Sequence, residues 1–249
     1  MPIAAPQNSG PSTEYSAEHA AIYDLIHAAR GRNWAREADE MAALIRERNP
    51  AARSLLDVAC GTGAHLAAFG GHFEDTAGLE LSPAMREIAR RSAPDATVHA
   101  GDMRDFQLGR TYDAVLCMCF SLGYMTSQDE LDAAADALVR HLAPGGVLIA
   151  EPWWFPEKFL DGYVSAALAE ERGRAVSRLS HTVRDGGISR MTVRYTVADA
   201  TGIRDFTEHE TYSLFTHDAY TTAFRRAGVA VEFLAGGPNG RGLFVGHRG

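Results

Sequence analysis

The chain has 249 residues and a formal net charge of -8, and 46% of its residues are hydrophobic while 22% are charged. A chain of this length and composition can bury the core of an ordinary globular domain. Its acidic balance, with no run of Lys or Arg, argues against a partner such as nucleic acid or an anionic membrane surface.

The sequence begins with a segment, residues 1–12, that is rich in Pro, Ser, Gly and Ala. This composition predicts a disordered leader, and the segment lacks the basic start and apolar stretch of a signal peptide. No apolar run approaches the ~20 residues that a membrane helix needs. The three cysteines include no CxxC pair, which argues against a disulfide framework. We therefore expect a cytoplasmic protein that contacts no membrane.

The next part of the sequence predicts helices and strands in alternation. Apolar spacing first indicates helices over residues 16–29 and 35–49. Short apolar runs then predict five strands, at residues 54–59, 76–81, 97–100, 112–118 and 147–151. Ser82-Pro83 and Ser127 begin two further helices, which we expect to end near residues 92 and 142, the second at Pro144-Gly145-Gly146. This alternation is typical of a mostly parallel sheet with helices on both faces.

The pattern changes after Pro156. Polar and apolar residues then alternate over three runs, at residues 176–183, 189–197 and 203–215, and Asp185-Gly186-Gly187 is a hairpin turn signal. We expect a small antiparallel sheet inserted over residues 157–215, which serves substrate binding, dimer contacts or both. A helix at residues 218–227 and a terminal antiparallel hairpin, residues 229–234 and 243–246, complete the core, which comprises residues 13–156 plus 216–249.

A glycine-rich segment, Asp57-Val58-Ala59-Cys60-Gly61-Thr62-Gly63, lies between a buried strand and a helix. Glycines at such a place let the backbone turn sharply and let a ligand approach it closely. The spacing is neither the G-x-G-x-x-G of dinucleotide-binding folds nor a P-loop, which argues against a nicotinamide oxidoreductase. Taken alone, a Gly-x-Gly is also what a simple tight turn contains.

Two acidic residues follow at the ends of the next two predicted strands. Glu80 lies about 20 residues beyond the glycines, where an acid can accept hydrogen bonds from both ribose hydroxyls of a nucleoside. Asp102, in Gly101-Asp102-Met103, ends the third strand, where it can bind an adenine amino group. Open α/β sheets bind ligands at the carboxyl ends of their strands, so the three features together predict a nucleoside-cofactor site.

These segments resemble the signature of the class I S-adenosylmethionine-dependent methyltransferases. The matching stretches are residues 56–63, Leu79-Glu80-Leu81-Ser82, Gly101-Asp102-Met103 and Leu142-Ala143-Pro144-Gly145-Gly146. The resemblance implies a Rossmann-like sheet and S-adenosylmethionine as the cofactor, with S-adenosylhomocysteine as its product. The cofactor-binding residues that it implies are Glu80 at the ribose, Asp102 and Met103 at the adenine, Met118 near the sulfonium, and Tyr23, Ala59 and Gly61.

A narrower resemblance extends over nearly the whole chain. Tyr23-Asp24-Leu25 and residues 101–106, 151–156 and 236–244 are similar to the N,N-dimethyltransferases of nucleotide-linked amino sugars, such as those of desosamine and mycaminose biosynthesis. The chain departs from that family in Met118-Cys119-Phe120-Ser121, where the family has Met-Phe-Ser-Ser, so the wall beside the sugar amine is expected to differ. The resemblance implies mono- or dimethylation of the amino group of a TDP-linked deoxyamino sugar in antibiotic biosynthesis, and we expect a homodimer.

The same resemblance implies roles for residues outside the cofactor site. Tyr15 and Tyr124 would hydrogen-bond the sugar amine and orient its lone pair, because a phenol with a pKa near 10 is a poor base at neutral pH. Arg241 would bind the diphosphate with its guanidinium fork. The remaining candidates for contacts to the base or the phosphates are Trp34, Trp153 and Arg178.

Two other interpretations of the sequence stay open. A methyltransferase that acts on another small molecule, such as a polyketide hydroxyl or glycine, would have the same cofactor motifs. A non-catalytic protein that binds the cofactor would also keep them. No pair of His residues has the spacing of a metal site, so we expect no metal and regard His65, His99 and His181 as structural or exposed.

Overall fold

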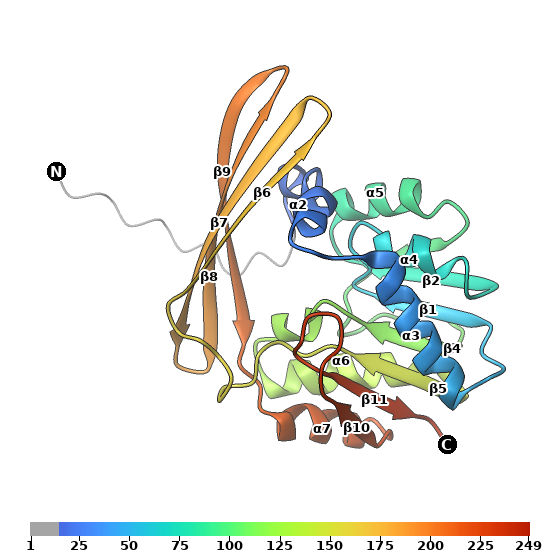
Figure 1. Cartoon of the computed structure of the whole chain (residues 1–249). Helices are drawn as coiled ribbons and strands as arrows, with labels where there is room; N and C mark the ends of the chain where they lie inside the picture. The colour runs from blue at the N-terminus through green and yellow to red at the C-terminus, as the bar shows by residue number, and fades with distance from the viewer. Residues whose placement is uncertain (1–14) are drawn as a thin grey trace.

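The computed structural model describes residues 15–249 and contains two sheets (Figure 1). The larger sheet has seven strands in the order β10-β11-β5-β4-β1-β2-β3, and the smaller has four in the order β6-β7-β8-β9. Figure 1 shows the four-stranded sheet to one side of the larger one, with α2 between them. The leader predicted over residues 1–12 lies outside the described residues.

The seven-stranded sheet has a parallel core that an antiparallel hairpin completes. Its parallel strands are β1 (Ser54–Val58), β2 (Asp75–Glu80), β3 (Thr97–Ala100), β4 (Tyr112–Cys117) and β5 (Leu142–Ala150). β10 (Val231–Leu234) pairs antiparallel with β11 (Leu243–His247), which pairs antiparallel with β5. The Rossmann-like α/β class predicted from the sequence is therefore confirmed.

Helices cover both faces of this sheet. Successive strand residues point to opposite faces, and the apolar side chains on each face pack against helices. Leu56 and Val58 of β1 pack in one apolar cluster with α6 (Gln128–Arg140) and α7 (His217–Arg226). Leu55 packs in a second cluster with α3 (Trp34–Arg48) and α4 (Ala64–Phe69). α5 (Pro83–Ser92) lies against β2 and β3. No helix in the described part of the chain is long and apolar enough to span a membrane.

Short-range signals set the starts of two helices as predicted. The Ser82 hydroxyl accepts the N–H of Met85 at 3.4 Å, and Pro83 is the first residue of α5. The Ser127 hydroxyl accepts the N–H of Glu130 at 3.2 Å at the start of α6. Side-chain caps of this kind satisfy amide groups that have no partner within the helix.

The smaller sheet is a meander of four antiparallel strands. They are β6 (Tyr163–Glu171), β7 (Arg174–Asp185), β8 (Ile188–Asp199) and β9 (Gly202–Ser213). Its inner face packs against α1 (Ala17–Ala20) and α2 (Tyr23–Ala29), since Ile22 and Ile26 share a cluster with Ala169, Val176 and Val193. Residues 17–29 are thereby held against the inserted sheet.

Three sequence-based element predictions were wrong in detail. The single helix predicted over residues 16–29 is two helices, because Ala21 and Ile22 form a turn between α1 and α2, with Ile22 buried against the inner face of the small sheet. Strand β6 was not predicted, because its alanine-rich sequence has low β propensity and its pairing with β7 decides its structure. β5 already begins at Leu142, which pairs with Tyr112, so the helix before it ends at Arg140.

Gly63 at the start of α4 gives a stability prediction. Its φ is +75°, and a Cβ there would lie 2.9 Å from the Cα of Ala89 in α5. We expect Gly63→Ala to lower the free energy of unfolding by about 3 kcal/mol, from the left-handed backbone and the overlap together. Gly109→Ala is a matched control, since Gly109 has a φ of +68° and open space around it. Both free energies of unfolding are measured by urea unfolding. Equal losses in the two variants would show that the overlap with Ala89 does not destabilise the protein.

Candidate active site

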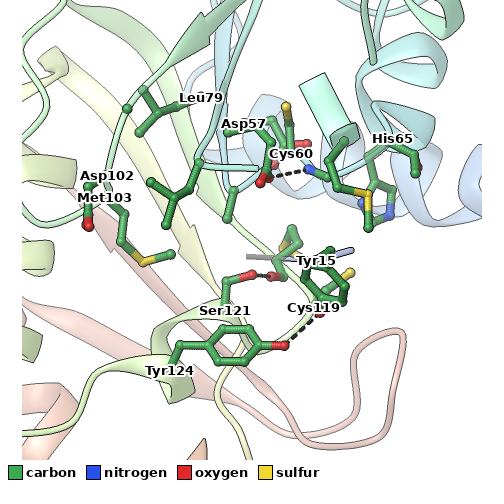
Figure 2. A pocket seen from close by; sticks show the side chains of 18 of the residues that line it. Tyr15, Asp57, Cys60, His65, Leu79, Asp102, Met103, Cys119, Ser121 and Tyr124 are labelled. Carbon is green, nitrogen blue, oxygen red and sulfur yellow. Dashed lines mark hydrogen bonds between the residues drawn. The ribbon is translucent and has the colours of Figure 1, made fainter. Parts of the chain in front are cut away.

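A first cavity, of about 290 Å³, lies at the carboxyl ends of the parallel strands. The predicted residues Ala59, Gly61, Glu80, Met103 and Met118 all line it, as do Asp102 and Tyr23. Figure 2 shows its walls, with Asp57 from β1, Cys60 from the glycine turn, and Asp102 and Met103 from the loop after β3. Strand order reverses between β1 and β4, and this is where open α/β sheets bind ligands.

Non-glycine residues with a positive φ lie at this cavity and at a second one beside it. Ala59, Cys119 and Phe120 are the non-glycine residues with positive φ in the described chain, at +60°, +54° and +55°. Ala59 and Cys119 line the first cavity, and Phe120 lines the second cavity described below. Such conformations cost energy and persist where the surrounding structure holds them, commonly at functional sites.

Glu80 ends β2 with its carboxylate held by backbone amides. One oxygen accepts the N–H of Gly61 at 2.9 Å, and the other accepts the N–H of Ser82 at 2.8 Å. Burial raises the pKa of Glu80, while these amide hydrogen bonds oppose that shift. Because a carboxylate can accept about four hydrogen bonds, each oxygen keeps a lone pair for a ligand hydroxyl.

Asp102 lines the same cavity, but its carboxylate is already engaged. Arg104 donates to it from its backbone N–H at 2.9 Å and from its guanidinium at 2.9 and 2.5 Å. These hydrogen bonds lower the pKa of Asp102, and Arg104 also bonds Glu130 at 2.6 Å. An adenine amino group would therefore share the Asp102 oxygens with Arg104.

A second cavity, of about 260 Å³, lies between the first helices, the inner face of the small sheet and the aromatic segment after β5. Trp153, Arg178 and Arg241 line it, as predicted for a substrate site. The Arg178 side chain is buried and donates to the Ser180 hydroxyl at 2.9 Å. The buried guanidinium of Arg178 and the partly buried one of Arg241 line one cavity and can bind the negative charges of a diphosphate.

Arg241 sits among aromatic rings at this cavity. Its guanidinium carbon lies 4.5 Å from the Phe120 ring centre, 4.7 Å from that of Trp153 and 4.8 Å from that of Trp154. Its Nε is buried and has no hydrogen-bond partner in the described structure, and burial lowers its pKa. A buried donor without a partner is costly, so the group is poised to bind an anionic ligand.

Asn239 fixes the glycine-rich loop that carries Arg241. It donates to the buried Glu151 carboxylate at 2.7 Å and accepts from Arg32 at 3.2 Å. Glu151 in turn accepts the N–H of Cys119 at 2.8 Å. The loop is thereby tied to the wall of the first cavity.

Tyrosines separate and connect the two cavities. Tyr15 and Tyr23 line both, and the hydroxyl of Tyr15 lies 2.6 Å from that of Tyr124 (Figure 2). The Tyr124 hydroxyl lies 2.8 Å from that of Tyr212, which donates to Glu210. Burial raises the pKa of Tyr15, Tyr124 and Tyr212 well above the usual value. These phenols are therefore neutral hydrogen-bonding groups rather than bases.

One predicted substrate residue lies elsewhere. Trp34 lines the first cavity rather than the second, where its ring contacts His65 edge-on at 4.9 Å between centres. Its place at the start of α3, capped by the Asn33 side chain, directs it toward the glycine turn. The structure therefore does not bring Trp34 together with Trp153, Arg178 and Arg241.

Glu210 and Tyr212 are among the residues of the second cavity that sequence reasoning missed. They follow one another on the same face of β9, and the strand alternation could have placed them inward. Sequence reasoning also left Asp57 without a role, although this residue lines the first cavity and burial raises its pKa to about 6. An acid inside an apolar strand is a signal that could have been followed.

Comparisons with known proteins agree with this geometry. A profile of the methyltransferase domain matches residues 55–146. The dTDP-4-amino-2,3,4,6-tetradeoxy-D-glucose N,N-dimethyltransferase of Saccharopolyspora spinosa is 59% identical over 95% of this chain and 95% of that protein. The dTDP-3-amino-3,4,6-trideoxy-alpha-D-glucopyranose N,N-dimethyltransferase of Streptomyces venezuelae is 53% identical over 93% of this chain and 98% of that protein. The chain belongs to the dTDP-amino-sugar N,N-dimethyltransferases.

Two solved structures superpose closely on the chain. DesVI of Streptomyces venezuelae gives a TM-score of 0.91 at 52% identity, covering 94% of this chain and 100% of that one. CalS10, an amino pentose methyltransferase of Micromonospora echinaspora solved with S-adenosylmethionine, gives 0.85 at 46% identity, covering 92% and 97%. S-adenosylmethionine is thus the cofactor of this methyltransferase.

The residues of the first cavity fit this cofactor. A Cβ at Gly61, whose φ is +57°, would meet nothing within 4 Å, so the backbone there is open to a ligand. Glu80 keeps free lone pairs for the ribose hydroxyls, as described above. The thioethers of Met103 and Met118 line the same cavity and supply the soft apolar surface that adapts to a ligand.

Proposed function

We propose that this methyltransferase transfers methyl groups to the amino group of a dTDP-linked deoxyamino sugar and forms the dimethylamine. The observation that supports this most strongly is that two cavities of similar size share Tyr15 and Tyr23 as a common wall. The first has the acids and glycines of a nucleoside site, and the second holds Arg178 and Arg241. Two ligands bound there would meet at the tyrosines.

The chemistry divides between the cofactor and the protein. When bound, S-adenosylmethionine supplies an activated methyl group, and the protein supplies placement. Glu80 and the glycine turn would hold the adenosine part. Arg178 and Arg241 would hold the diphosphate, with Trp153 in the wall beside it. Fixing both ligands in one geometry can supply much of the rate enhancement.

Tyr15 and Tyr124 would orient the sugar amine at the junction. Their hydroxyls are neutral and already hydrogen-bonded to one another, so they are suited to hold an N–H group in place. We expect Tyr124→Phe to lower kcat by about 10-fold, because the variant loses only the orientation of the amine. The loss of a general acid or base would lower the rate by about 10²–10⁴-fold. Single-turnover methylation of a dTDP-amino sugar measures this. A rate equal to the uncatalysed background would show that Tyr124 does more than orient.

The sugar itself is the part that requires a direct assay. One relative acts on a 4-amino sugar at 59% identity and another on a 3-amino sugar at 53% identity, so identity alone does not choose the amine position. We propose incubating the protein with labelled cofactor and a panel of dTDP-3-amino and dTDP-4-amino sugars, with products read by mass. A gain of two methyl groups on one of them supports the proposal. Transfer only to other small molecules, or none, would contradict it.

We also propose that the outer face of the small sheet forms a homodimer. It exposes Val164, Leu168, Leu179 and Ile203 by 57–79%, and the strand register places all four on one face. An exposed apolar patch of this kind marks an interaction surface. Ala230, an exposed residue directly before β10, lies outside the small sheet and serves as a control. Light scattering should show Leu168→Glu as a monomer and the wild type and Ala230→Glu as dimers. A dimeric Leu168→Glu variant would place the interface elsewhere.

A further inference from the structure

A row of hydroxyl groups runs from the junction of the cavities to a carboxylate. Tyr15 and Tyr124 are 2.6 Å apart at their oxygens, Tyr124 and Tyr212 are 2.8 Å apart, and Tyr212 donates to Glu210. Glu210 lines the second cavity together with Arg178. Tyr15 lines both cavities, so the row begins where the two ligands would meet.

The carboxylate gives this row a direction. A carboxylate only accepts hydrogen bonds, and each phenol has a single hydrogen to donate. Tyr212 donates its only hydroxyl hydrogen to Glu210, so its oxygen must accept the hydrogen bond from Tyr124. Tyr124 can then only accept from Tyr15. With Glu210 ionised, every hydroxyl hydrogen points toward Glu210, and every oxygen presents its lone pairs toward the junction.

Two arginines beside Glu210 favour its ionised form. Arg178 on β7 and Arg30 at the end of α2 line the same cavity. Burial raises the pKa of Glu210 above its usual value and the charge of Glu208 adds to that shift, while the hydrogen bond from Tyr212 and the charges of Arg178 and Arg30 oppose it. The neighbouring Glu208 of the same strand instead accepts from the Ser16 hydroxyl at 2.6 Å, outside the row.

We propose that Glu210 sets the direction of the hydroxyl row so that Tyr15 meets the sugar amine as a hydrogen-bond acceptor. This inference rests on the proposed function. An acceptor oxygen binds an N–H of the amine and leaves the nitrogen lone pair free for the methyl group. A donating hydroxyl would instead engage that lone pair and compete with the transfer.

The same arrangement limits the number of methyl groups. In each transfer the nitrogen lone pair forms the N–C bond, the S–C bond breaks with its electrons left on sulfur, and one proton then leaves the nitrogen for solvent. A primary amine starts with two N–H groups, and the monomethylamine keeps one. The neutral dimethylamine has none. As an acceptor, Tyr15 can therefore position the primary amine and the monomethylamine. The dimethylamine lacks the N–H group that Tyr15 binds.

Glu210→Gln tests this directly, with product masses followed over time at saturating substrates. A glutamine amide can donate to Tyr212 and so reverse the row. In the reversed row Tyr15 no longer accepts an N–H of the amine. The monomethylamine has only one N–H, so its positioning suffers more than that of the primary amine. We therefore expect the ratio of monomethyl to dimethyl product to rise at least 10-fold. Glu210→Asp keeps an acceptor-only group and should stay near the wild-type ratio. Glu208→Gln makes the same change on the same strand outside the row; it removes a charge that raises the pKa of Glu210, so Glu210 stays ionised and the ratio should not change.

A second variant separates the row from the fold. Tyr212→Phe keeps the buried ring and removes the link between Tyr124 and the carboxylate, so it should raise the same ratio even if Glu210→Gln fails to fold. A wild-type ratio in either folded variant, or an equal rise in Glu208→Gln, would overturn the inference. If the wild type methylates no dTDP-amino sugar, the proposed function itself fails, which is a different result.

Discussion

Replacing Glu80 with alanine is expected to weaken S-adenosylmethionine binding by about 100-fold or more. Hydrogen bonds to a charged acceptor are worth about 1.5–3 kcal/mol each, and two ribose hydroxyls would lose theirs. About 1.4 kcal/mol corresponds to a tenfold change in affinity. The substitution also leaves the amides of Gly61 and Ser82 without their acceptor. Isothermal titration calorimetry with the cofactor measures the loss.

Two controls sharpen this test. Glu80→Gln keeps the size of the side chain and one acceptor oxygen, but its NH2 group would face the N–H of Gly61 or of Ser82. We expect a loss of about 10-fold, smaller than that of Glu80→Ala. Glu87→Ala removes an exposed acid of α5 that pairs with Arg91, and it should bind the cofactor like the wild type. Wild-type affinity in Glu80→Ala would show that the ribose lies elsewhere.

The second large effect is expected at Arg241. We expect Arg241→Ala to raise the KM for the dTDP-sugar by about 100-fold, because a guanidinium that binds a diphosphate bidentately makes strong charge-assisted hydrogen bonds. Affinity for S-adenosylmethionine should not change, since Arg241 lines the second cavity and not the first. Steady-state kinetics with varied dTDP-sugar, and titration with dTDP alone, separate these quantities.

Further variants distinguish contact from general charge. Arg241→Lys keeps the charge but not the planar fork that lies among Phe120, Trp153 and Trp154, so it should recover only part of the affinity. Arg190→Ala removes an exposed arginine of β8 that pairs with Asp185 and should leave the KM unchanged. An unchanged KM in Arg241→Ala would place the diphosphate away from this loop.

Features set by short-range signals could be predicted from the sequence. The glycine turn after β1 and Glu80 at the end of β2 were identified by their spacing, and both line the first cavity. The caps at Ser82 and Ser127 were found because a cap and its partner lie three residues apart. The alternation of strands and helices likewise gave the parallel sheet.

Features that depend on distant pairs could not be predicted in the same way. The contact between Tyr15 and Tyr124 joins residues 109 positions apart, and that between Tyr124 and Tyr212 spans 88. The role of Glu210 follows only from this row. Strand β6 depends on its pairing with β7. The position of Trp34 at the first cavity depends on the path of α3, which cannot be read from one sequence.

A crystal structure with S-adenosylhomocysteine and a dTDP-amino sugar tests the central claim most directly. We expect the ribose hydroxyls on the Glu80 carboxylate, the diphosphate on Arg241, and the sugar amine within hydrogen-bonding distance of Tyr15. A sugar nucleotide bound outside the second cavity, or an adenosine away from Glu80, would contradict the account.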